Sequence, residues 1–205
     1  MPDISILNTK SANFHSVKKA IDLYNKQNII TSDINEINNS KGLIIPGVSS
    51  TDTVMQNIKD LNLEKIILDF YSSGKPILCI CVGMQILFEN SEEGVKPGLG
   101  IIEGSVKKIP KLKNKFKVPH MGWNQLELVK ESEIFKGIST NTNFYFVHSY
   151  FCDPLDEEII IGKTNYSIQM CAAIQKNNLL AVQFHPEKSG KDGLKIYENF
   201  NKMIS

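Results

Sequence analysis

The stretch Pro76-Ile77-Leu78-Cys79-Ile80-Cys81-Val82-Gly83-Met84-Gln85 decides the fold of this chain. Its apolar residues before Cys81 form an uninterrupted run, which predicts a central strand buried on both faces. Gly83 comes two residues after Cys81, and the apolar residues 86–88 predict the start of a helix. A buried strand that turns sharply into a helix around one nucleophilic side chain is typical of a nucleophile elbow.

At such an elbow, the side chain of Cys81 would point outward at the carboxyl end of the sheet. It would also lie near the amino end of a helix, whose dipole favours a thiolate. Gly83 would leave room for this helix to pack closely against the strand. The alternative interpretation of the same residues is a structural cysteine in the core.

The segments before the elbow alternate between strand and helix. The predicted elements are a strand over 4–7, a helix over 13–24, a strand over 42–45, a helix over 63–71 and a strand over 77–80. Asn62 is expected to cap the second helix, and Gly74 is expected to end it. This order predicts a parallel sheet with helices on both faces.

The second half of the chain is richer in strands. Strands are expected over 100–109, 144–147, 159–162, 171–174 and 179–184, followed by a last helix over 193–203. No linker or repeat divides the chain, so residues 1–205 are predicted to form one domain. The basic stretch 107–117 is interpreted as a solvated loop.

Composition restricts the function classes. The chain has 205 residues, 41% of them hydrophobic and 22% charged, with a net charge of +1. A charge so close to zero provides no strong attraction to nucleic acid or to a membrane surface. No apolar run is long enough to span a bilayer, and the first residues lack a signal-peptide pattern, so a cytoplasmic location is expected.

A second candidate site motif is Gln183-Phe184-His185-Pro186-Glu187. An apolar strand ends at His185, and Glu187 lies close enough in sequence to reach back to the imidazole. A base that is oriented by a carboxylate is the arrangement that activates a cysteine nucleophile.

A third segment, Pro46-Gly47-Val48, is a turn after an apolar strand. Its backbone N–H at Val48 could join the N–H of Val82 as an oxyanion-hole donor. Taken alone, the segment indicates only a turn.

The cysteines and histidines do not indicate a metal site. Cys79 and Cys81 are too close for the usual zinc pair, and the four histidines share no ligand spacing. No phosphate-binding glycine loop is present either. We therefore expect no metal and no cofactor, and we interpret Cys152 and Cys171 as core residues.

With Cys81, His185 and Glu187 in place, the chain resembles the class-I glutamine amidotransferases. It is similar in particular to the glutaminase subunits of imidazole glycerol phosphate synthases. The segments that carry the resemblance are 6–13, 76–88, 118–125, 144–150 and 183–190. The resemblance implies a flavodoxin-like three-layer α/β sandwich with a mixed, mainly parallel sheet.

The resemblance also implies an activity. Cys81 would form a glutamyl thioester, His185 would act as general base and acid, and Glu187 would orient it, so that glutamine is hydrolysed to glutamate and ammonia. The positions that match the substrate-binding residues are Gln85, Glu93, His148, Ser149 and Tyr150.

The implied partner is a (β/α)8-barrel cyclase subunit of histidine biosynthesis, which would form a heterodimer with this chain and receive the ammonia. Positions that match its interface are Asn13, His120, Met121, Trp123, Asn124, Tyr145 and Lys188. Without the resemblance, segment 120–124 is interpreted as a loop with one buried aromatic residue.

Two other functions are open at this stage. A paralogous glutaminase could supply ammonia to a sugar amidotransferase in surface glycan biosynthesis, and it would differ only at its partner-facing residues. A binding subunit with a decayed site is disfavoured by the intact Cys-His-Glu set. Two departures from the family pattern, Cys79 and Ser49 in place of glycines, are expected to affect rate and regulation.

Overall fold

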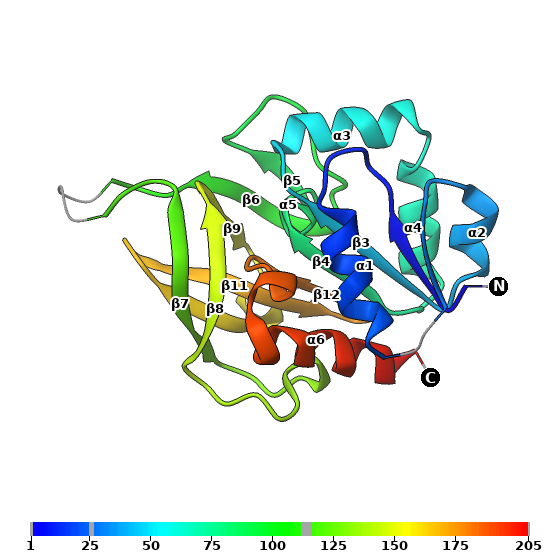
Figure 1. Ribbon diagram of the computed structural model, residues 1–205. Helices are drawn as coiled ribbons and strands as arrows, with labels where there is room; N and C mark the ends of the chain where they lie inside the picture. The colour runs from blue at the N-terminus through cyan, green and yellow to red at the C-terminus, as the bar shows by residue number, and fades with distance from the viewer. Residues whose placement is uncertain (1, 25–26, 112–115, 205) are drawn as a thin grey trace.

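The computed structural model describes residues 2–24, 27–111 and 116–204 as an α/β fold on a twelve-stranded mixed sheet (Figure 1). The strands are β1 (Ile4–Leu7), β2 (Asn28–Thr31), β3 (Gly42–Gly47), β4 (Ile77–Cys81), β5 (Phe88–Ser91), β6 (Ile102–Lys108), β7 (His120–Leu128), β8 (Thr142–His148), β9 (Tyr150–Pro154), β10 (Ile160–Asn165), β11 (Gln169–Lys176) and β12 (Leu179–Val182). The helices are α1 (Phe14–Asp22), α2 (Ile34–Asn39), α3 (Thr51–Asp60), α4 (Glu64–Ser72), α5 (Val82–Gln85) and α6 (Gly190–Met203), with 3-10 turns η2 (Glu133–Phe135), η3 (Glu157–Ile159) and η4 (Pro186–Lys188).

The first half of the chain forms a parallel sheet in the order β2-β1-β3-β4, and β12 joins it as a parallel neighbour of β4. In this register Val182 of β12 lies beside Ile80 of β4. Both strands therefore end at the same edge of the sheet, which brings the segments after Cys81 and after Val182 together. The order β-α-β predicted from the sequence is confirmed.

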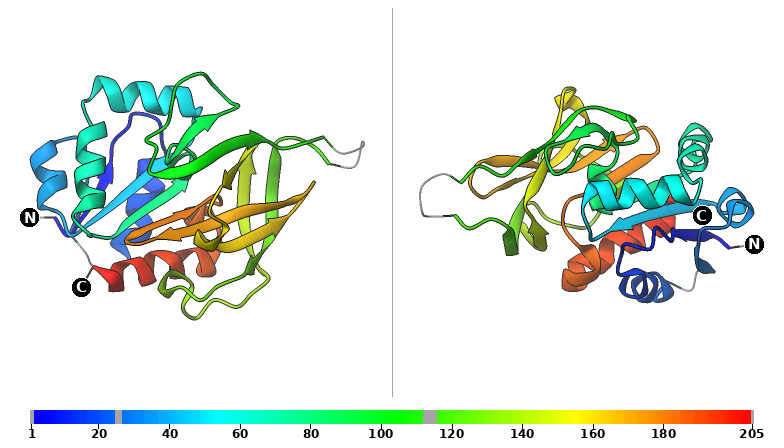
Figure 2. Two further views of the ribbon diagram at one scale, coloured as in Figure 1. Left: turned by 180° about the vertical axis from the view of Figure 1, so that it is seen from behind. Right: turned by 90° about the horizontal axis from the view of Figure 1, so that it is seen from above.

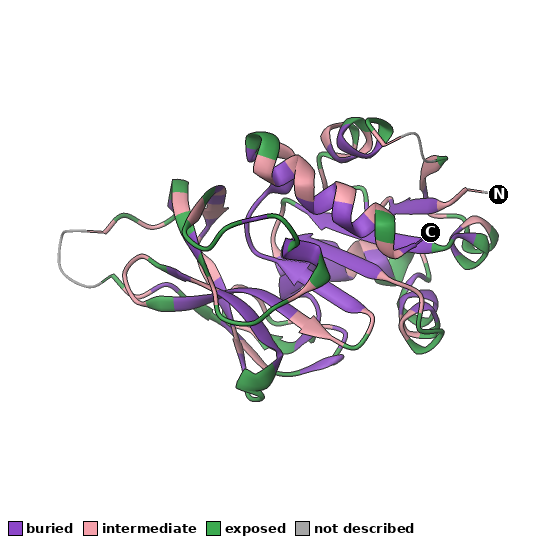
Figure 3. Ribbon diagram, turned by 90° about the horizontal axis from the view of Figure 1, so that it is seen from below, coloured by how far each residue is buried: buried purple, intermediate pink, exposed green. Residues whose placement is uncertain are grey.

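Helices cover both faces of this parallel part. α1 and α6 lie together on one face, and α3 and α4 lie on the other (Figure 2). α1 buries Val17, Ala20 and Ile21 at helical spacing, as expected for a helix with one apolar face. The buried residues are concentrated in the central strands and in the inward faces of these helices (Figure 3).

The second half adds strands beyond β12 that pair mainly antiparallel, and it projects away from the parallel part (Figure 1). Its outer part is the β7–β8 ribbon, in which His120 lies opposite His148 and Trp123 lies opposite Tyr145. Segment 120–124 is thus part of strand β7 and its Trp123 is exposed, so the expectation of a loop with one buried aromatic residue is wrong. Its alternating buried and exposed residues fit a strand with one covered face.

Two local expectations also need correction. Asn62 does not cap α4: it adopts a left-handed conformation (φ 55°), and Leu63 is the N-cap, without a side-chain hydrogen bond. The helix after the elbow is the single turn Val82–Gln85, so the expected helix start over residues 86–88 is wrong: Ile86 is the C-cap, and β5 already begins at Phe88. Gly74 (φ 76°) ends the α4 segment as predicted.

The fold class predicted from the sequence is confirmed: an α/β sandwich with a mixed sheet. The basic stretch 107–117 is described only at its two ends, because residues 112–115 lie outside the described residues. Among residues 2–24, 27–111 and 116–204, no helix has the length and apolar character that crossing a bilayer requires.

Candidate active site

The elbow at the end of β4 has the predicted geometry. Cys81 has φ 56° and ψ −112°, a strained conformation for a residue with a side chain, and is 3% exposed. A Cβ on Gly83 would clash with the carbonyl oxygen of Ile45, so only glycine fits there. α5 has four residues, so the expected helix dipole is too short to contribute much to a thiolate.

His185 follows β12 at the same edge of the sheet. Its Nδ1 lies 2.8 Å from Oε1 of Glu187, and both side chains are 2% exposed. Nε2 of His185 is buried and has no hydrogen-bond partner among the described residues. The Glu187 carboxylate therefore fixes the ring with Nδ1 as a donor and leaves Nε2 for a reacting group.

Electrostatics couple His185 to Cys81. Burial lowers the pKa of His185, but the neighbouring Cys81 sulfur and the Glu187 carboxylate outweigh it and raise this pKa to about 10. An imidazolium at neutral pH stabilises a thiolate beside it. The two groups on which the interpretation depends therefore lie on the same side of the sheet and interact.

Both residues line a pocket of about 550 Å³. All five expected substrate-binding residues line it as well: Gln85, Glu93, His148, Ser149 and Tyr150. Glu93 is oriented by α3, because its Oε2 accepts a hydrogen bond of 2.7 Å from the N–H of Thr51. The structure thus brings together Cys81 and His185, which lie 104 residues apart in the chain.

The two expected oxyanion donors, Val48 and Val82, also line this pocket. The N–H of Val82 belongs to the first residue of α5 and so has no acceptor within that helix. The N–H of Val48 instead donates to the carbonyl of Ser11 at 3.0 Å. In this conformation Val48 is not available as a donor to a bound substrate.

The two departures from the family pattern fit the fold. Cys79 is fully buried in β4 between Ile45 and Ala181, and burial raises the pKa of its thiol well above the usual value. Ser49 lines the pocket without a positive φ, so its side chain is not strained there. Its Oγ is buried and has no hydrogen-bond partner in the described part of the chain.

Of the expected partner-facing residues, Lys188 lines the pocket, and Met121, Trp123 and Tyr145 lie on the neighbouring β7–β8 ribbon. Met121 and Trp123 are 62% and 58% exposed. Trp123 packs edge-on against Tyr145, with ring centroids 6.2 Å apart, and Lys188 Nζ lies 5.8 Å from the Tyr145 ring. Asn13 is exposed and caps α1 through a bond to the N–H of Ser16.

His120 differs from its expected place on the partner-facing surface. It is 2% exposed, and its ring lies between Phe146 and Tyr166, with centroid distances of 4.9 and 4.1 Å. It alternates along β7 with exposed Met121, so its side chain points inward. His120 therefore does not present its ring to a partner.

Sequence reasoning gave no role to three buried polar residues near the site. Gln183 is fully buried and contacts Cys81, with Nε2 3.7 Å from Sγ. Ser189 donates to the His185 carbonyl at 2.6 Å, and the Tyr197 hydroxyl donates to Oε2 of Glu187 at 3.4 Å. The one available signal was Gln183 itself, a polar residue inside an apolar run.

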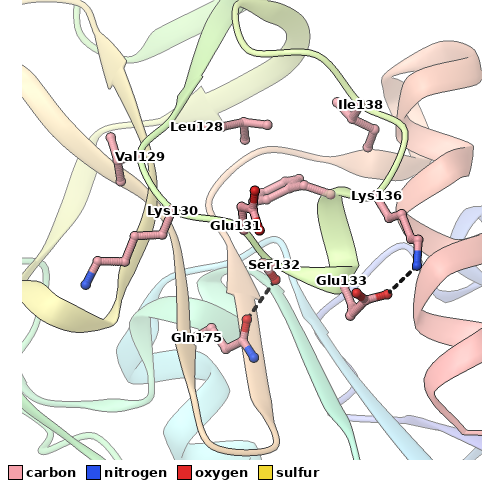
Figure 4. A pocket seen from close by; sticks show the side chains of 10 residues that line it. Leu128, Val129, Lys130, Glu131, Ser132, Glu133, Lys136, Ile138 and Gln175 are labelled. Atoms are coloured by element: carbon pink, nitrogen blue, oxygen red, sulfur yellow. Dashed lines mark hydrogen bonds and ion pairs between the residues drawn. The ribbon is translucent and has the colours of Figure 1, made fainter.

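A wider hollow of about 740 Å³ lies beside η2 and contains none of the predicted site residues. Figure 4 shows that its polar side chains bond to one another: Ser132 donates to Gln175, and Lys136 pairs with Glu133. Lys130 points away from it and pairs with Glu158. Its lining residues are Leu128, Val129, Lys130, Glu131, Ser132, Glu133, Phe135, Lys136, Ile138 and Gln175.

The remaining thiols are buried. Burial raises the pKa of Cys152 and of Cys171, the latter to about 12, so both are neutral core thiols. Within the part of the chain that is described, no three His, Cys, Asp or Glu side chains are grouped so that they could hold a metal ion.

Comparisons with known proteins agree with this geometry. The family model of class-I glutamine amidotransferases matches residues 6–203. The imidazole glycerol phosphate synthase subunit HisH of Methanocaldococcus jannaschii is 46% identical, over 98% of this chain and 100% of the relative. The subunit HisH of Moorella thermoacetica is 40% identical, over 100% of this chain and 96% of the relative.

A solved structure supports the fold alone. A chain of PurLQS from Thermotoga maritima superimposes with a TM-score of 0.75 at 16% identity, covering 100% of both chains. Because the family model spans nearly the whole sequence and the HisH relatives match along almost their full length, this chain belongs to the class-I glutamine amidotransferases and, among them, to the HisH subunits of imidazole glycerol phosphate synthase.

Proposed function

We propose that Cys81, His185 and Glu187 hydrolyse glutamine through a thioester, and that the ammonia passes to a (β/α)8-barrel cyclase partner in histidine biosynthesis. The observation that carries this proposal is the buried Glu187–His185 pair, whose unpartnered Nε2 lies in the same pocket as the elbow cysteine. The whole chain, residues 1–205, serves as one domain, no cofactor takes part, and the location is the cytoplasm.

The reaction follows from these groups. The Cys81 thiolate attacks the side-chain amide carbon of glutamine, and the tetrahedral intermediate collapses as the C–N bond breaks. His185 gives its proton to the departing nitrogen, so ammonia leaves and a thioester remains. His185 then takes a proton from water, the resulting hydroxide attacks the thioester, and glutamate leaves as the thiolate is restored.

The pocket supplies matching groups for a zwitterionic amino acid. The Glu93 carboxylate is suited to the substrate ammonium, and the segment Ser149–Tyr150 to its carboxylate. Gln85 has both amide hydrogens engaged, one with the Tyr150 carbonyl at 3.1 Å and one with Gln183 at 3.0 Å. Gln85 can therefore offer a substrate only its carbonyl oxygen, which suits an N–H donor.

The oxyanion hole needs a rearrangement before it has two donors. Val82 can donate as it stands, but Val48 must first break its 3.0 Å bond with the Ser11 carbonyl. Loss of one such donor typically lowers turnover by about 100- to 1,000-fold. We therefore expect the isolated chain to be nearly inactive, and the liganded partner to activate it by favouring the rotated peptide.

The partner would bind over the pocket, whose lining includes the 51% exposed Val48, and over the adjoining ribbon that exposes Met121 and Trp123. Lys188 links the two surfaces, because it lines the pocket and its Nζ lies 5.8 Å from the Tyr145 ring, which packs against Trp123. Exposed aromatic and apolar groups of this kind are typical of binding sites for proteins. A heterodimer sealed there would keep ammonia from water, where it is protonated and lost. The names of the relatives favour the histidine pathway over an amidotransferase of sugars.

The test is glutamate release by the chain mixed with its cyclase partner. We expect Cys81→Ala to abolish release, because Cys81 is the only cysteine among the described residues that line the pocket. Cys79→Ala is the matched control, since Cys79 lies in the core of the same strand. Full activity of Cys81→Ala, or full activity of the wild-type chain without partner, would contradict the proposal.

A further inference from the structure

Gln183 lies directly beside the nucleophile. It directly follows β12, one residue beyond the pairing of Val182 with Ile80, and it is fully buried. Its side chain makes two contacts: Nε2 lies 3.7 Å from the Cys81 sulfur, and Oε1 lies 3.0 Å from Nε2 of Gln85. A buried amide side chain normally has a hydrogen-bonding reason for its place in a core.

The orientation of these two amides is forced by a backbone carbonyl. The Tyr150 oxygen can only accept, so the Gln85 atom 3.1 Å from it must be Nε2. The same nitrogen faces Gln183 at 3.0 Å, so the Gln183 atom there must be Oε1. The nitrogen of Gln183 is thereby turned toward sulfur, and flipping either amide would place two donors or two acceptors against each other.

The same carbonyl is held from its other side. Nδ1 of His148 lies 2.8 Å from the Tyr150 oxygen and must carry a proton there. Nε2 of His148 then accepts from Nδ1 of His120 at 2.9 Å. Nε2 of His120 accepts in turn from the amide of Asn124 at 3.2 Å, so both rings are fixed as neutral Nδ1–H tautomers.

We infer that Gln183 is a positioning residue for Cys81: its amide nitrogen donates to the sulfur, and Gln85 and the Tyr150 carbonyl fix the direction of that donation. This inference rests on the proposed role of Cys81 as nucleophile. A donor aimed at sulfur favours the thiolate over the thiol and holds it on one rotamer toward the pocket. The series of hydrogen bonds that begins at Gln183 continues through the Tyr150 carbonyl and the two histidines. It ends at Asn124, which lies on the same strand as exposed Trp123.

The test measures the thiolate directly. Alkylation of the full chain by iodoacetamide is followed from pH 5 to 10, with peptide mass spectrometry to count modification at Cys81 alone. In Gln183→Met, which keeps the size and removes the donor, we expect the midpoint of the rate to rise by about one pH unit. At pH values below the midpoints of both wild type and Gln183→Met, a shift of one unit corresponds to about tenfold slower alkylation of the variant.

Two further variants make the outcome specific. Gln175→Met is the matched control, because Gln175 also accepts a side-chain hydrogen bond, from Ser132, but at the wider hollow. It should leave the midpoint unchanged. Gln183→Asn keeps an amide but withdraws it from sulfur, and it should raise the midpoint even if Gln183→Met does not fold.

Midpoints within 0.3 units of wild type in the folded Gln183 variants, as a rough limit of the assay, would overturn the inference. A role in packing alone would lower the melting temperature without moving the midpoint. Failure of the proposed function looks different: the wild-type chain would then show no preferential alkylation of Cys81, and Cys81→Ala would keep glutaminase activity with the partner.

Discussion

Acidification from pH 7 to pH 5 should destabilise this protein through His120 and His148. Burial lowers the pKa of His120 to about 4, and burial with the neighbouring rings of His120 and His185 lowers that of His148 to about 3. Each ring is neutral in the native state, whereas an unfolded histidine titrates near 6.5. The unfolded chain therefore binds more protons below about pH 6.5, and stability falls as pH falls through that value.

The magnitude follows from the gap between the two states. At about 1.4 kcal/mol per unit, each ring loses about 2 kcal/mol by pH 5, or about 4 kcal/mol together. His185 acts with the opposite sign, because its raised pKa keeps it protonated in the folded state. It therefore offsets about 1 kcal/mol of this loss of stability between pH 7 and pH 5. The net loss of about 3 kcal/mol is a large part of the 5–15 kcal/mol that typically holds a domain folded.

The assay is urea unfolding at pH 7 and pH 5, followed by far-UV circular dichroism. His148→Gln removes one titrating ring. Its free energy of unfolding should therefore fall by about 2 kcal/mol less than that of the wild type between pH 7 and pH 5. His15→Gln, at an exposed ring on α1, is the control and should keep the full wild-type loss. A wild-type change below about 1 kcal/mol, or an undiminished change in His148→Gln, would refute the neutral, buried pair.

Three further outcomes follow from the site. Gly83→Ala should destabilise the fold by about 3 kcal/mol or more, because the new Cβ meets the Ile45 carbonyl; urea unfolding measures this, and a loss under about 1 kcal/mol would contradict the close approach. Cys81→Ser should lower the pKa of His185, since the sulfur is the largest influence that raises it; an unchanged NMR titration would show the two do not interact. Trp123→Ala should weaken binding of the cyclase partner about tenfold or more by calorimetry, and unchanged affinity would place the interface elsewhere.

Much of the site could be predicted from local sequence. The elbow needs an apolar strand, a nucleophile and a glycine within a few residues, and each of these requirements is readable in segment 76–85. The pairing of His185 with Glu187 is equally local, because the two residues are separated by one proline. These short-range patterns also predicted part of the parallel half of the sheet, namely β1, β3 and β4 with α1 and α4, but they missed β2, α2 and α3.

Other features were misjudged because they depend on which strands become neighbours. Segment 120–124 shows its strand character only through pairing with β8, which buries His120 and exposes Trp123 on alternate positions. The helix after Cys81 ends after one turn because the segment that follows it forms strand β5, which pairs with β6. Such competition between tertiary pairing and local propensity is not visible in one segment.

The amino-acid sequence by itself predicted the candidate nucleophile and its candidate base, since each lies in a short motif, and the motifs together predicted the class of reaction. Only the tertiary structure decided which way the amide of Gln183 points and that the Val48 N–H is bound to Ser11. The physical reason is that a hydrogen bond has a direction set by its partner. Here the partners are 98 residues apart for Gln85 and Gln183, and packing alone brings them within reach.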